Sequence, residues 1–308
     1  MLYKLHPNTK SALWVVFATL IAVVALVVVM NLTNPATNTA DMPVEQIVFM
    51  RDDGNDMEIF TINSDGTNER QLTNNEFTDW GPLFSPGKDY IAFHSNREGY
   101  DAIYLMNMGC HHNSTYRVTP EGQYARYPSF SPDGTQLAFE MYMGDNNWDI
   151  FIMSLVDGSM QRVTFDAAID GGASFSPDGT KLAYHSTQNG YYDIYVLDLE
   201  TNRTERLTFY TETMDVWPEW SPSGDSIIFH SERDGDSEIF IMDANGRNQT
   251  NLTNNDTLER TPRFSADGSQ IVFRAERDGI SNIYIMDADG NNIRPLTDNP
   301  LSDWYPDF

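Results

Sequence analysis

The sequence predicts an all-β protein, a six-bladed β-propeller with one N-terminal transmembrane helix. A repeat of about 45 residues carries this prediction, together with four apolar stretches in each repeat and a long uncharged run near the start. The repeat is marked by aromatic residues at Phe84, Phe130, Phe175, Trp220, Phe264 and Phe308. Their spacings of 46, 45, 45, 44 and 44 residues match the length of one four-stranded propeller blade.

Each repeat has the same internal order. The aromatic residue is followed by a turn such as SPDG, an apolar stretch such as YIAFHS (90–95), an Ile-aromatic pair and a segment ending in Thr. Apolar residues that alternate around β-branched and aromatic types, separated by Gly, Asp, Asn and Pro, are typical of short antiparallel strands. We name these strands a to d from the channel outward. Proline recurs in strand a at 82, 128, 218, 262 and 306, which suits the free inner edge of a blade.

The two ends of the repeat region complement each other. Residues 46–73 supply strands b, c and d without a strand a before them, and residues 304–308 supply a strand a with nothing after it. We therefore expect the C-terminal strand a to join strands b to d of the first blade and close the ring.

The N-terminal segment has a different character. Residues Ala12 to Met30 form 19 residues without a charge, about the length that crosses a bilayer as a helix. A cleaved signal peptide is the alternative, but its apolar region usually runs about 7–15 residues. The sequence therefore predicts a cytoplasmic N-terminus (1–10), a transmembrane anchor (11–30), a linker (31–43) and the propeller (44–308).

Charge sets the predicted orientation and narrows the partners. Lys4 and Lys10 precede the apolar run, and no basic residue follows it until Arg51, so a single-pass protein with an extracytoplasmic propeller, periplasmic or extracellular, is expected. The chain has 45 acidic and 19 basic residues, a net charge of −26. Such a surface repels nucleic acid and suits basic peptides, cations or simple solubility.

The repeat motifs carry a family resemblance. The segments FHSERDGDSEIFIMDANG (229–246) and FRAERDGISNIYIMDADG (273–290) are similar to repeats of the TolB-like, or WD-like, β-propeller family, and the resemblance extends over residues 44–308. The α/β domain that precedes the propeller in TolB is not present before these repeats. The resemblance implies the propeller fold. It leaves function open, because relatives include a protein–protein hub, propellers attached to peptidases and polysaccharide lyases.

A candidate ligand site follows from the repeat register. Three residues before the strand-a proline, or its counterpart, five of the six repeats have a carboxylate, at Asp79, Asp170, Asp215, Glu259 and Asp303, and the sixth has Ala125. Equivalent positions in a ring should bring these groups to one mouth of the channel. Nearby residues complete the candidate site: Trp80, Arg126, Trp217, Arg260 and Trp304. In the alternative interpretation, each Asp bonds backbone amides where the chain enters strand a.

The sequence contains little that indicates a metal site or a catalytic site. His94, His185 and His230 end strand b in their blades, where equivalent positions should lie about 10 Å apart, too far for one zinc ion with bonds of about 2.0–2.1 Å. The turns DADGNN and DDGND lack the ligand spacing of an EF-hand. No Gly-x-Ser-x-Gly elbow or phosphate-binding loop occurs, so no catalytic residue is named. The one cofactor left open is a divalent cation such as calcium.

Three functions remain in consideration. The first is a monomeric, membrane-anchored extracytoplasmic propeller that binds a protein or a basic peptide over the acidic channel mouth. The second is a carbohydrate- or lactone-active lyase or hydrolase that uses a channel-bound divalent cation. The third is a purely structural scaffold.

Overall fold

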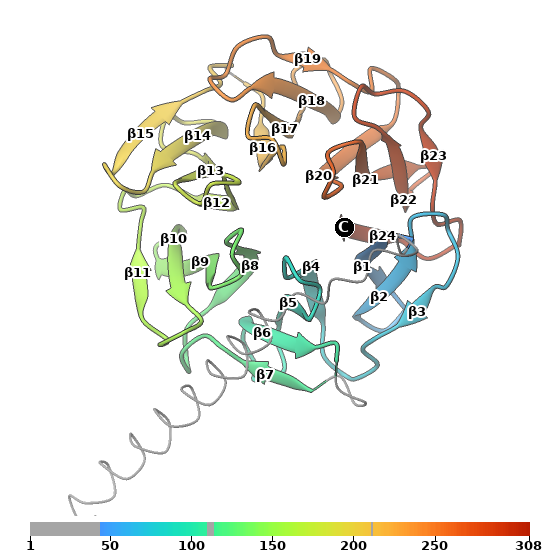
Figure 1. The fold of residues 1–308 in the computed structure, drawn as a ribbon, viewed down its shortest axis with the longest axis horizontal. Helices are drawn as coiled ribbons and strands as arrows, with labels where there is room; N and C mark the ends of the chain where they lie inside the picture. Colours follow the sequence, from blue (N-terminus) through green and yellow to red (C-terminus); the bar gives the residue numbers. More distant parts are fainter. Residues whose placement is uncertain (1–43, 110–113, 211) are drawn as a thin grey trace, which may run out of the picture.

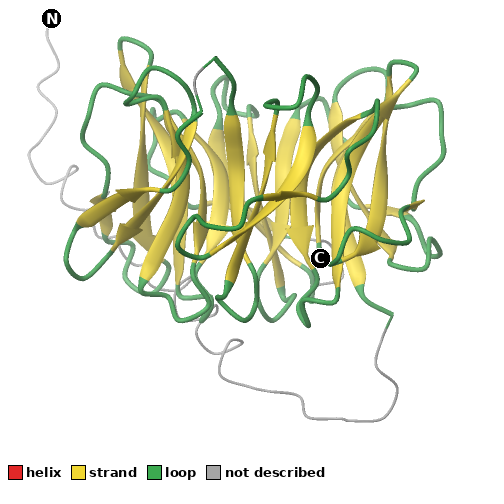
Figure 2. Ribbon diagram, turned by 90° about the horizontal axis from the view of Figure 1, so that it is seen from above, coloured by secondary structure: helices red, strands yellow, loops and turns green. Residues whose placement is uncertain are grey.

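Six four-stranded antiparallel sheets surround a central axis like the blades of a propeller (Figure 1). The computed structural model describes residues 44–109, 114–210 and 212–308. In these residues every element is a strand, and the strands stand roughly side by side around the ring when it is seen edge-on (Figure 2). The predicted six-bladed all-β fold is confirmed.

The first three blades are ordered from the inner strand outward as follows. Blade 1 contains β24 (Asp303–Asp307), β1 (Gln46–Asp52), β2 (Met57–Asn63) and β3 (Arg70–Gln71). Blade 2 contains β4 (Asp79–Phe84), β5 (Tyr90–Ser95), β6 (Ala102–Asn107) and β7 (Thr115–Arg117). Blade 3 contains β8 (Ala125–Phe130), β9 (Gln136–Gly144), β10 (Asn147–Ser154) and β11 (Met160–Arg162).

The other three blades repeat this order. Blade 4 contains β12 (Asp170–Phe175), β13 (Lys181–Ser186), β14 (Asp193–Asp198) and β15 (Arg203–Arg206). Blade 5 contains β16 (Asp215–Trp220), β17 (Ser226–Ser231), β18 (Glu238–Asp243) and β19 (Thr250–Asn251). Blade 6 contains β20 (Leu258–Phe264), β21 (Gln270–Arg277), β22 (Ile280–Asp287) and β23 (Arg294–Pro295).

The ring closes through its two ends. Strand β24 pairs antiparallel with β1, where Val48 lies opposite Asp307 and Met50 opposite Trp304. The predicted closure of blade 1 by the C-terminal strand is therefore confirmed. The predicted cytoplasmic segment, transmembrane helix and linker fall in residues 1–43, outside the described residues. Within the described residues no helix has the length and apolar character of a membrane span.

The core lies between neighbouring blades. Strands β5 and β6 are buried along their whole length, because a blade in the ring is covered on both faces. Six apolar clusters fill the six junctions, and each draws residues from two adjacent blades. At the junction of blades 6 and 1, for example, Val272 and Ile283 pack with Phe49 and Phe308. Burial of this apolar surface stabilises the ring.

The recurring Thr after strand d has a structural role. In every blade its hydroxyl oxygen accepts the backbone N–H of the strand-c isoleucine, at 2.8–3.0 Å. The six pairs are Ile59 with Thr73, Ile103 with Thr119, Ile150 with Thr164, Ile194 with Thr208, Ile239 with Thr253 and Ile283 with Thr297. Since strand d is only two to four residues long, this bond satisfies an amide that the short strand leaves free.

The two ends of the ring differ in their connections. We call the end with the a–b and c–d turns the turn face, and the end with the b–c and d–a connections the loop face. On the turn face, Asp133 accepts the N–H of Thr135 at 3.0 Å and the hydroxyl of Ser131 at 2.6 Å, while Gly134 has a φ of +69°. The SPDG segments are thus tight turns held by local hydrogen bonds.

Candidate functional site

A β-bulge interrupts every inner strand at the same place. The pairing of β4 with β5 shifts register between Trp80 and Leu83, and the other five inner strands shift at the equivalent point. The residue before the proline position has a positive φ of 50–59° in all six blades. These residues are Gly81, Tyr127, Gly172, Trp217, Thr261 and Tyr305. They line the central channel together with the strand-a prolines.

Large and small residues alternate at the bulge around the axis. Tyr127, Trp217 and Tyr305 come from blades 3, 5 and 1, and their ring centroids lie 4.7, 5.3 and 5.4 Å apart. The small residues Gly81, Gly172 and Thr261 occupy the blades between them. The three rings form a plug, and the cavity beside it measures about 20 Å³, far below the 300–1,000 Å³ or so of a small-molecule site. The candidate site is therefore a face of the ring, not its interior.

The strand-b histidines support the plug. His94 Nδ1 accepts the N–H of Tyr127 at 3.4 Å, and His185 Nδ1 accepts that of Trp217 at 3.3 Å. His230 Nδ1 accepts the N–H of Thr261 in the same way. Burial lowers the pKa of His94 and of His185 to about 3 and that of His230 well below its usual value. The imidazoles are thus neutral, and each joins its blade to the bulge of the next.

In blade 3 a carboxylate takes the histidine position. Glu140 Oε1 accepts the N–H of Gly172 at 3.0 Å, the same bond to the next blade. A Cβ on Gly172 would lie 2.6 Å from the ring of His185, so this position requires glycine. The sequence analysis identified the histidines but not their role as acceptors of a backbone N–H in the next blade. A hydrogen-bond acceptor nevertheless recurs at this repeat position, as His94, Glu140, His185 and His230.

The predicted carboxylate ring is buried. Asp79, Asp170, Asp215, Glu259 and Asp303 have exposed fractions of at most 1%. Three of these groups form ion pairs within their own blades: Asp79 with Arg97 at 2.8 Å, Asp215 with Arg233 at 2.7 Å and Asp303 with Arg51 at 2.6 Å. The five acids occupy equivalent repeat positions and were therefore expected at the same height along the axis of the ring. The repeat pattern could not predict that arginines from strand b or the b–c loop cover them. Their role in ligand binding stays a prediction.

The d–a loops also bond these acids. The side-chain amides of Asn75, Asn255 and Asn299 donate to Asp79, Glu259 and Asp303, respectively, at 3.0–3.1 Å. Each asparagine stands two residues after the Thr of its blade. These contacts are of the local kind that the alternative interpretation expects.

Two members of the ring have no arginine partner among the described residues. Burial raises the pKa of Asp170 and of Glu259 to about 7. Glu259 lies beside Glu238, a second carboxylate that is 2% exposed. Asn255 links them, donating its backbone N–H to Glu238 at 2.7 Å and its side-chain amide to Glu259. Because two buried anions repel each other, the Glu259 carboxyl is partly protonated near neutral pH.

The remaining predicted site residues lie partly exposed around the channel on the loop face. The guanidinium of Arg126 lies 3.7 Å from the ring centroid of Trp148 and pairs with Glu140 at 2.6 Å. Trp80 stacks on His94 at 6.3 Å, and Arg260 pairs with Glu232 at 3.3 Å. Trp304 lies 6.0 Å from the guanidinium of Arg274. Trp80, Arg126, Arg260 and Trp304 thus each follow directly after the strand-a acid position or its counterpart Ala125, whereas Trp217 belongs to the plug.

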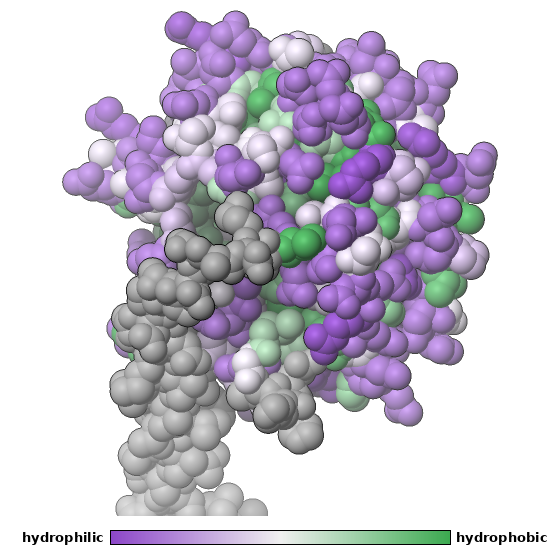
Figure 3. Space-filling view, turned by 45° about the vertical axis from the view of Figure 1, so that its right-hand side comes forward, coloured by the Kyte–Doolittle hydropathy of each residue, from purple (hydrophilic) through white to green (hydrophobic). Residues whose placement is uncertain are grey.

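Exposed aromatic side chains mark the same face. In the described residues, seven aromatic side chains are exposed: Phe77, Tyr124, Tyr142, Phe165, Tyr191, Phe209 and Tyr210. All seven belong to b–c or d–a connections or to the strand ends beside them, so none lies on the turn face. On the side of the molecule seen in Figure 3, the surface is mostly hydrophilic, with small hydrophobic areas. Such a one-sided distribution indicates an interaction surface.

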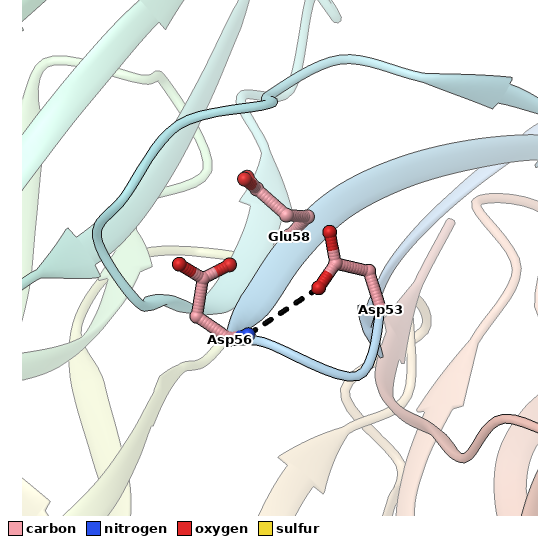
Figure 4. Close-up of side chains that lie close together, drawn as sticks. All are labelled: Asp53, Asp56 and Glu58. Atoms are coloured by element: carbon pink, nitrogen blue, oxygen red, sulfur yellow. Dashed lines mark hydrogen bonds between the residues drawn. The ribbon is translucent and has the colours of Figure 1, made fainter.

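A carboxylate cluster lies at the b–c loop of blade 1. Oxygens of Asp53, Asp56 and Glu58 approach within 4.8 Å of one another (Figure 4). Burial raises the pKa of Asp56 and of Glu58, and the neighbouring carboxylates raise that of Asp56 further. Carboxylate oxygens suit calcium, but Asp53 accepts the N–H groups of Asn55 and Asp56, which accounts for its position as a turn residue. The EF-hand spacing could not reveal this cluster, since Glu58 lies on β2.

Known proteins with this repeat were compared with the chain. A family model described as the TolB beta propeller domain matches residues 125–216 and 210–306. The Tol-Pal system protein TolB of Gluconobacter oxydans is 30% identical over 106 residues, which make up 33% of this chain and 22% of that protein. The chain thus matches well under two thirds of that relative's length.

Solved structures show the same fold. TolB from Acinetobacter baumannii superposes with a TM-score of 0.75 at 24% identity, covering 85% of this chain and 66% of that one. An oligogalacturonate lyase from Vibrio parahaemolyticus gives 0.56 at 12% identity, covering 82% and 74%. At these identities the likeness shows the fold alone. Since the family model covers more than half of the 308 residues, the chain belongs to the TolB β-propeller domain family.

Proposed function

We propose that this protein is an extracytoplasmic scaffold that binds a partner protein on the loop face of its propeller, tethered to the membrane through residues 11–30. The observation that carries the proposal is the gathering of all seven exposed aromatic side chains of the described residues on that face. Exposed Tyr, Trp and Arg side chains supply much of the binding energy at protein interfaces. Membership of the TolB propeller family supports a protein-binding role.

The chemistry of the face suggests the kind of partner. The chain carries a net charge of −26, and acidic side chains accompany the aromatic ones in most of the loops. A basic protein or peptide segment fits this charge and would be drawn to the face by long-range attraction. We place the partner over the channel mouth, in contact with Trp80, Arg126 and Trp304, with the buried acids beneath.

Capture of partners from membranes tests this proposal. The test variant replaces Phe165, Phe209 and Tyr210 with Ser, since these side chains are 71%, 65% and 46% exposed and their loss should leave the fold intact. The matched control replaces Val156 and Met160 with Ser, at exposed positions near the turn face. We expect crosslinking from membranes to recover the same partner with wild type and control but not with the loop-face variant. Equal recovery with all three proteins would show that these three side chains do not bind the partner, and equal recovery with a further variant that replaces Tyr124 and Tyr142 with Ser would then refute the loop-face assignment.

The buried carboxylates are unsuitable for such a test. Asp79, Asp215 and Asp303 form internal ion pairs, so their replacement would alter stability together with any binding. The lyase or hydrolase alternative stays a prediction, since no contact in the described residues favours it over the scaffold.

A further inference from the structure

A row of four aromatic rings crosses the loop face over blades 2 and 3. Its members, which we call the aromatic row, are Tyr100, Tyr124, Tyr142 and Trp148. Successive ring centroids lie 5.6, 6.3 and 5.2 Å apart. The four rings come from the b–c loop of blade 2, the β7–β8 connection, β9 and β10. Tyr124 and Tyr142, in the middle of the row, are 48% and 38% exposed, so their faces are open to a partner.

The row is held rigidly at its outer end. The hydroxyl oxygen of Tyr100 accepts the N–H of Gly122 at 2.7 Å and a guanidinium N–H of Arg117 at 3.0 Å. The Tyr100 hydroxyl also donates to Glu98 at 3.2 Å. These bonds fix the b–c loop of blade 2 against the β7–β8 connection that carries Tyr124.

A tight hairpin fixes the inner end. Strands β9 and β10 are joined by Asp145 and Asn146, both with positive φ, at 49° and 60°, as in the two-residue turns that match strand twist. Arg126 covers the Trp148 ring at 3.7 Å. A preorganised row loses little side-chain entropy on binding, and this favours affinity.

The angles between the rings select the shape of the ligand. Neighbouring rings are inclined at 54°, 74° and 51°, so they form successive ridges and slots instead of one flat platform. A sugar ring stacks best on a flat, open aromatic face. A polyproline II helix has three residues per turn and no internal hydrogen bonds, so its proline rings project as separate ridges that can enter such slots. Aromatic-lined surfaces of this kind dock proline-rich segments.

The charges beside the row select the flanking residues. Asp101, Glu121 and Asp145 adjoin the row in sequence and form no ion pair within the described residues. The nearby arginines are already neutralised, Arg117 by Glu98 and Arg126 by Glu140. The row therefore presents net negative charge, which attracts Lys and Arg and repels phosphate.

We infer that the aromatic row binds a proline-rich segment with interspersed Lys or Arg residues, contributed by the partner protein. This inference rests on the proposed function, and it names the chemistry of the partner's docking segment. Proline rings would occupy the slots on either side of Tyr124 and Tyr142, and basic side chains would reach the acidic side chains at the flanks.

Titration calorimetry on the full chain tests the inference with synthetic peptides. The probe is three Pro-Pro-Lys units in tandem, and the comparison peptides replace every Pro with Ala or every Lys with Glu. We expect the probe to bind wild type and both comparison peptides to bind at least about tenfold more weakly. The double variant Tyr124→Ala with Tyr142→Ala should lose a similar factor. Val156→Ala, 48% exposed near the turn face, should stay within about twofold.

Several results would overturn the inference. If the probe does not bind wild type, the inference is refuted. If the alanine peptide binds as tightly as the probe, the row attracts basic peptides by charge and does not recognise proline. If a neutral glucan oligomer binds instead of the peptide, and this binding is lost when Tyr124 and Tyr142 are replaced, then the aromatic row is a carbohydrate site. The partner could also be captured by the double variant but not by the variant at Phe165, Phe209 and Tyr210. That result would refute docking on the aromatic row and would support the proposed scaffold function.

Discussion

Asp303, near the end of the chain, forms a two-pronged ion pair with Arg51 in the first blade. Nε of Arg51 lies 2.6 Å from Oδ1 of Asp303, and Nη2 of Arg51 lies 3.1 Å from Oδ2. The carboxylate is 0% exposed and the arginine 7%. Two residues 252 positions apart in sequence thus lock the closing strand to the ring.

Breaking this pair should weaken the whole propeller. Asp303→Asn leaves the buried Arg51 paired only with Glu69, and we expect a loss of up to about 3 kcal/mol in the free energy of unfolding. Urea denaturation measures the loss. Glu232→Gln, which breaks the half-exposed pair with Arg260, serves as control and should cost less than about 1 kcal/mol. Similar losses for the two variants would show that the Arg51 pair has no special part in closure.

Deleting residues 302–308 should remove cooperative folding. The deletion takes away the β24–β1 ladder, the Arg51 pair and the buried Phe308 side chain. A synthetic peptide of residues 299–308 should restore a cooperative thermal transition when added in excess, because it can refill the inner position of blade 1. A truncated chain with the melting temperature of the full one would contradict closure by this strand.

Glu259 and Asp170 should contribute stability at acid pH that is lost as the pH rises towards 7. Burial raises the pKa of Glu259 to about 7 from 4.5 and that of Asp170 to about 7 from 3.8. The folded state therefore holds protons that the unfolded state releases, and the stabilisation present at low pH is lost between about pH 4.5 and 7. For Glu259 the loss from pH 5 to pH 8 should be on the order of 2 kcal/mol.

The variant Glu259→Gln isolates this effect. Relative to wild type, the unfolding free energy at pH 8 minus that at pH 5 should rise by about 2 kcal/mol, because the amide keeps a neutral group beside Glu238 at both pH values. Glu232→Gln again provides the control, with the full pH dependence retained. An unchanged difference in Glu259→Gln would show that Glu259 holds no extra proton in the folded state.

Acid should destabilise the ring through its histidines. Burial lowers the pKa of His94 and of His185 to about 3 from 6.5, so only the unfolded state gains protons as the pH falls below about 6.5. This stabilisation is present above pH 6.5 and is lost towards pH 3. In His185→Asn, an amide oxygen can accept the N–H of Trp217, and the slope of unfolding free energy against pH between 6.5 and 4.5 should decrease by about one proton. A slope equal to wild type would indicate that His185 does not titrate on unfolding.

The sequence was sufficient for the architecture, because blade count and closure depend only on a periodic pattern. The bulge was harder to predict. A positive φ at Tyr127, Trp217 and Tyr305 is uncommon for such residues, and the only clue was glycine at Gly81 and Gly172 in the same register. The repeat register of the sequence also predicted that the five acids lie at the same height along the axis. It did not reveal whether each side chain faces the axis or an arginine of its own blade.

The arrangement of the aromatic residues in one row could not be predicted from the sequence either. Tyr100, Tyr124, Tyr142 and Trp148 belong to four connections or strands of two blades, and only the folded ring brings them into one row. In blade 3 the usual b–c motif is replaced by a tight hairpin, and Ala125 stands where the other blades have an acid. Those local departures from the repeat were visible in the sequence and coincide with the row.

The alternation of large and small residues in the plug makes the blades non-interchangeable. Because Tyr127, Trp217 and Tyr305 fill the axis from every second blade, the ring is threefold at its centre although it is sixfold at its rim. Rotating the repeat order by two blades would preserve the packing of the axis, whereas inserting a single blade would place two bulky or two small residues side by side. The packing of the axis therefore repeats with a unit of two blades, about 90 residues, and not with the 45-residue repeat of the sequence.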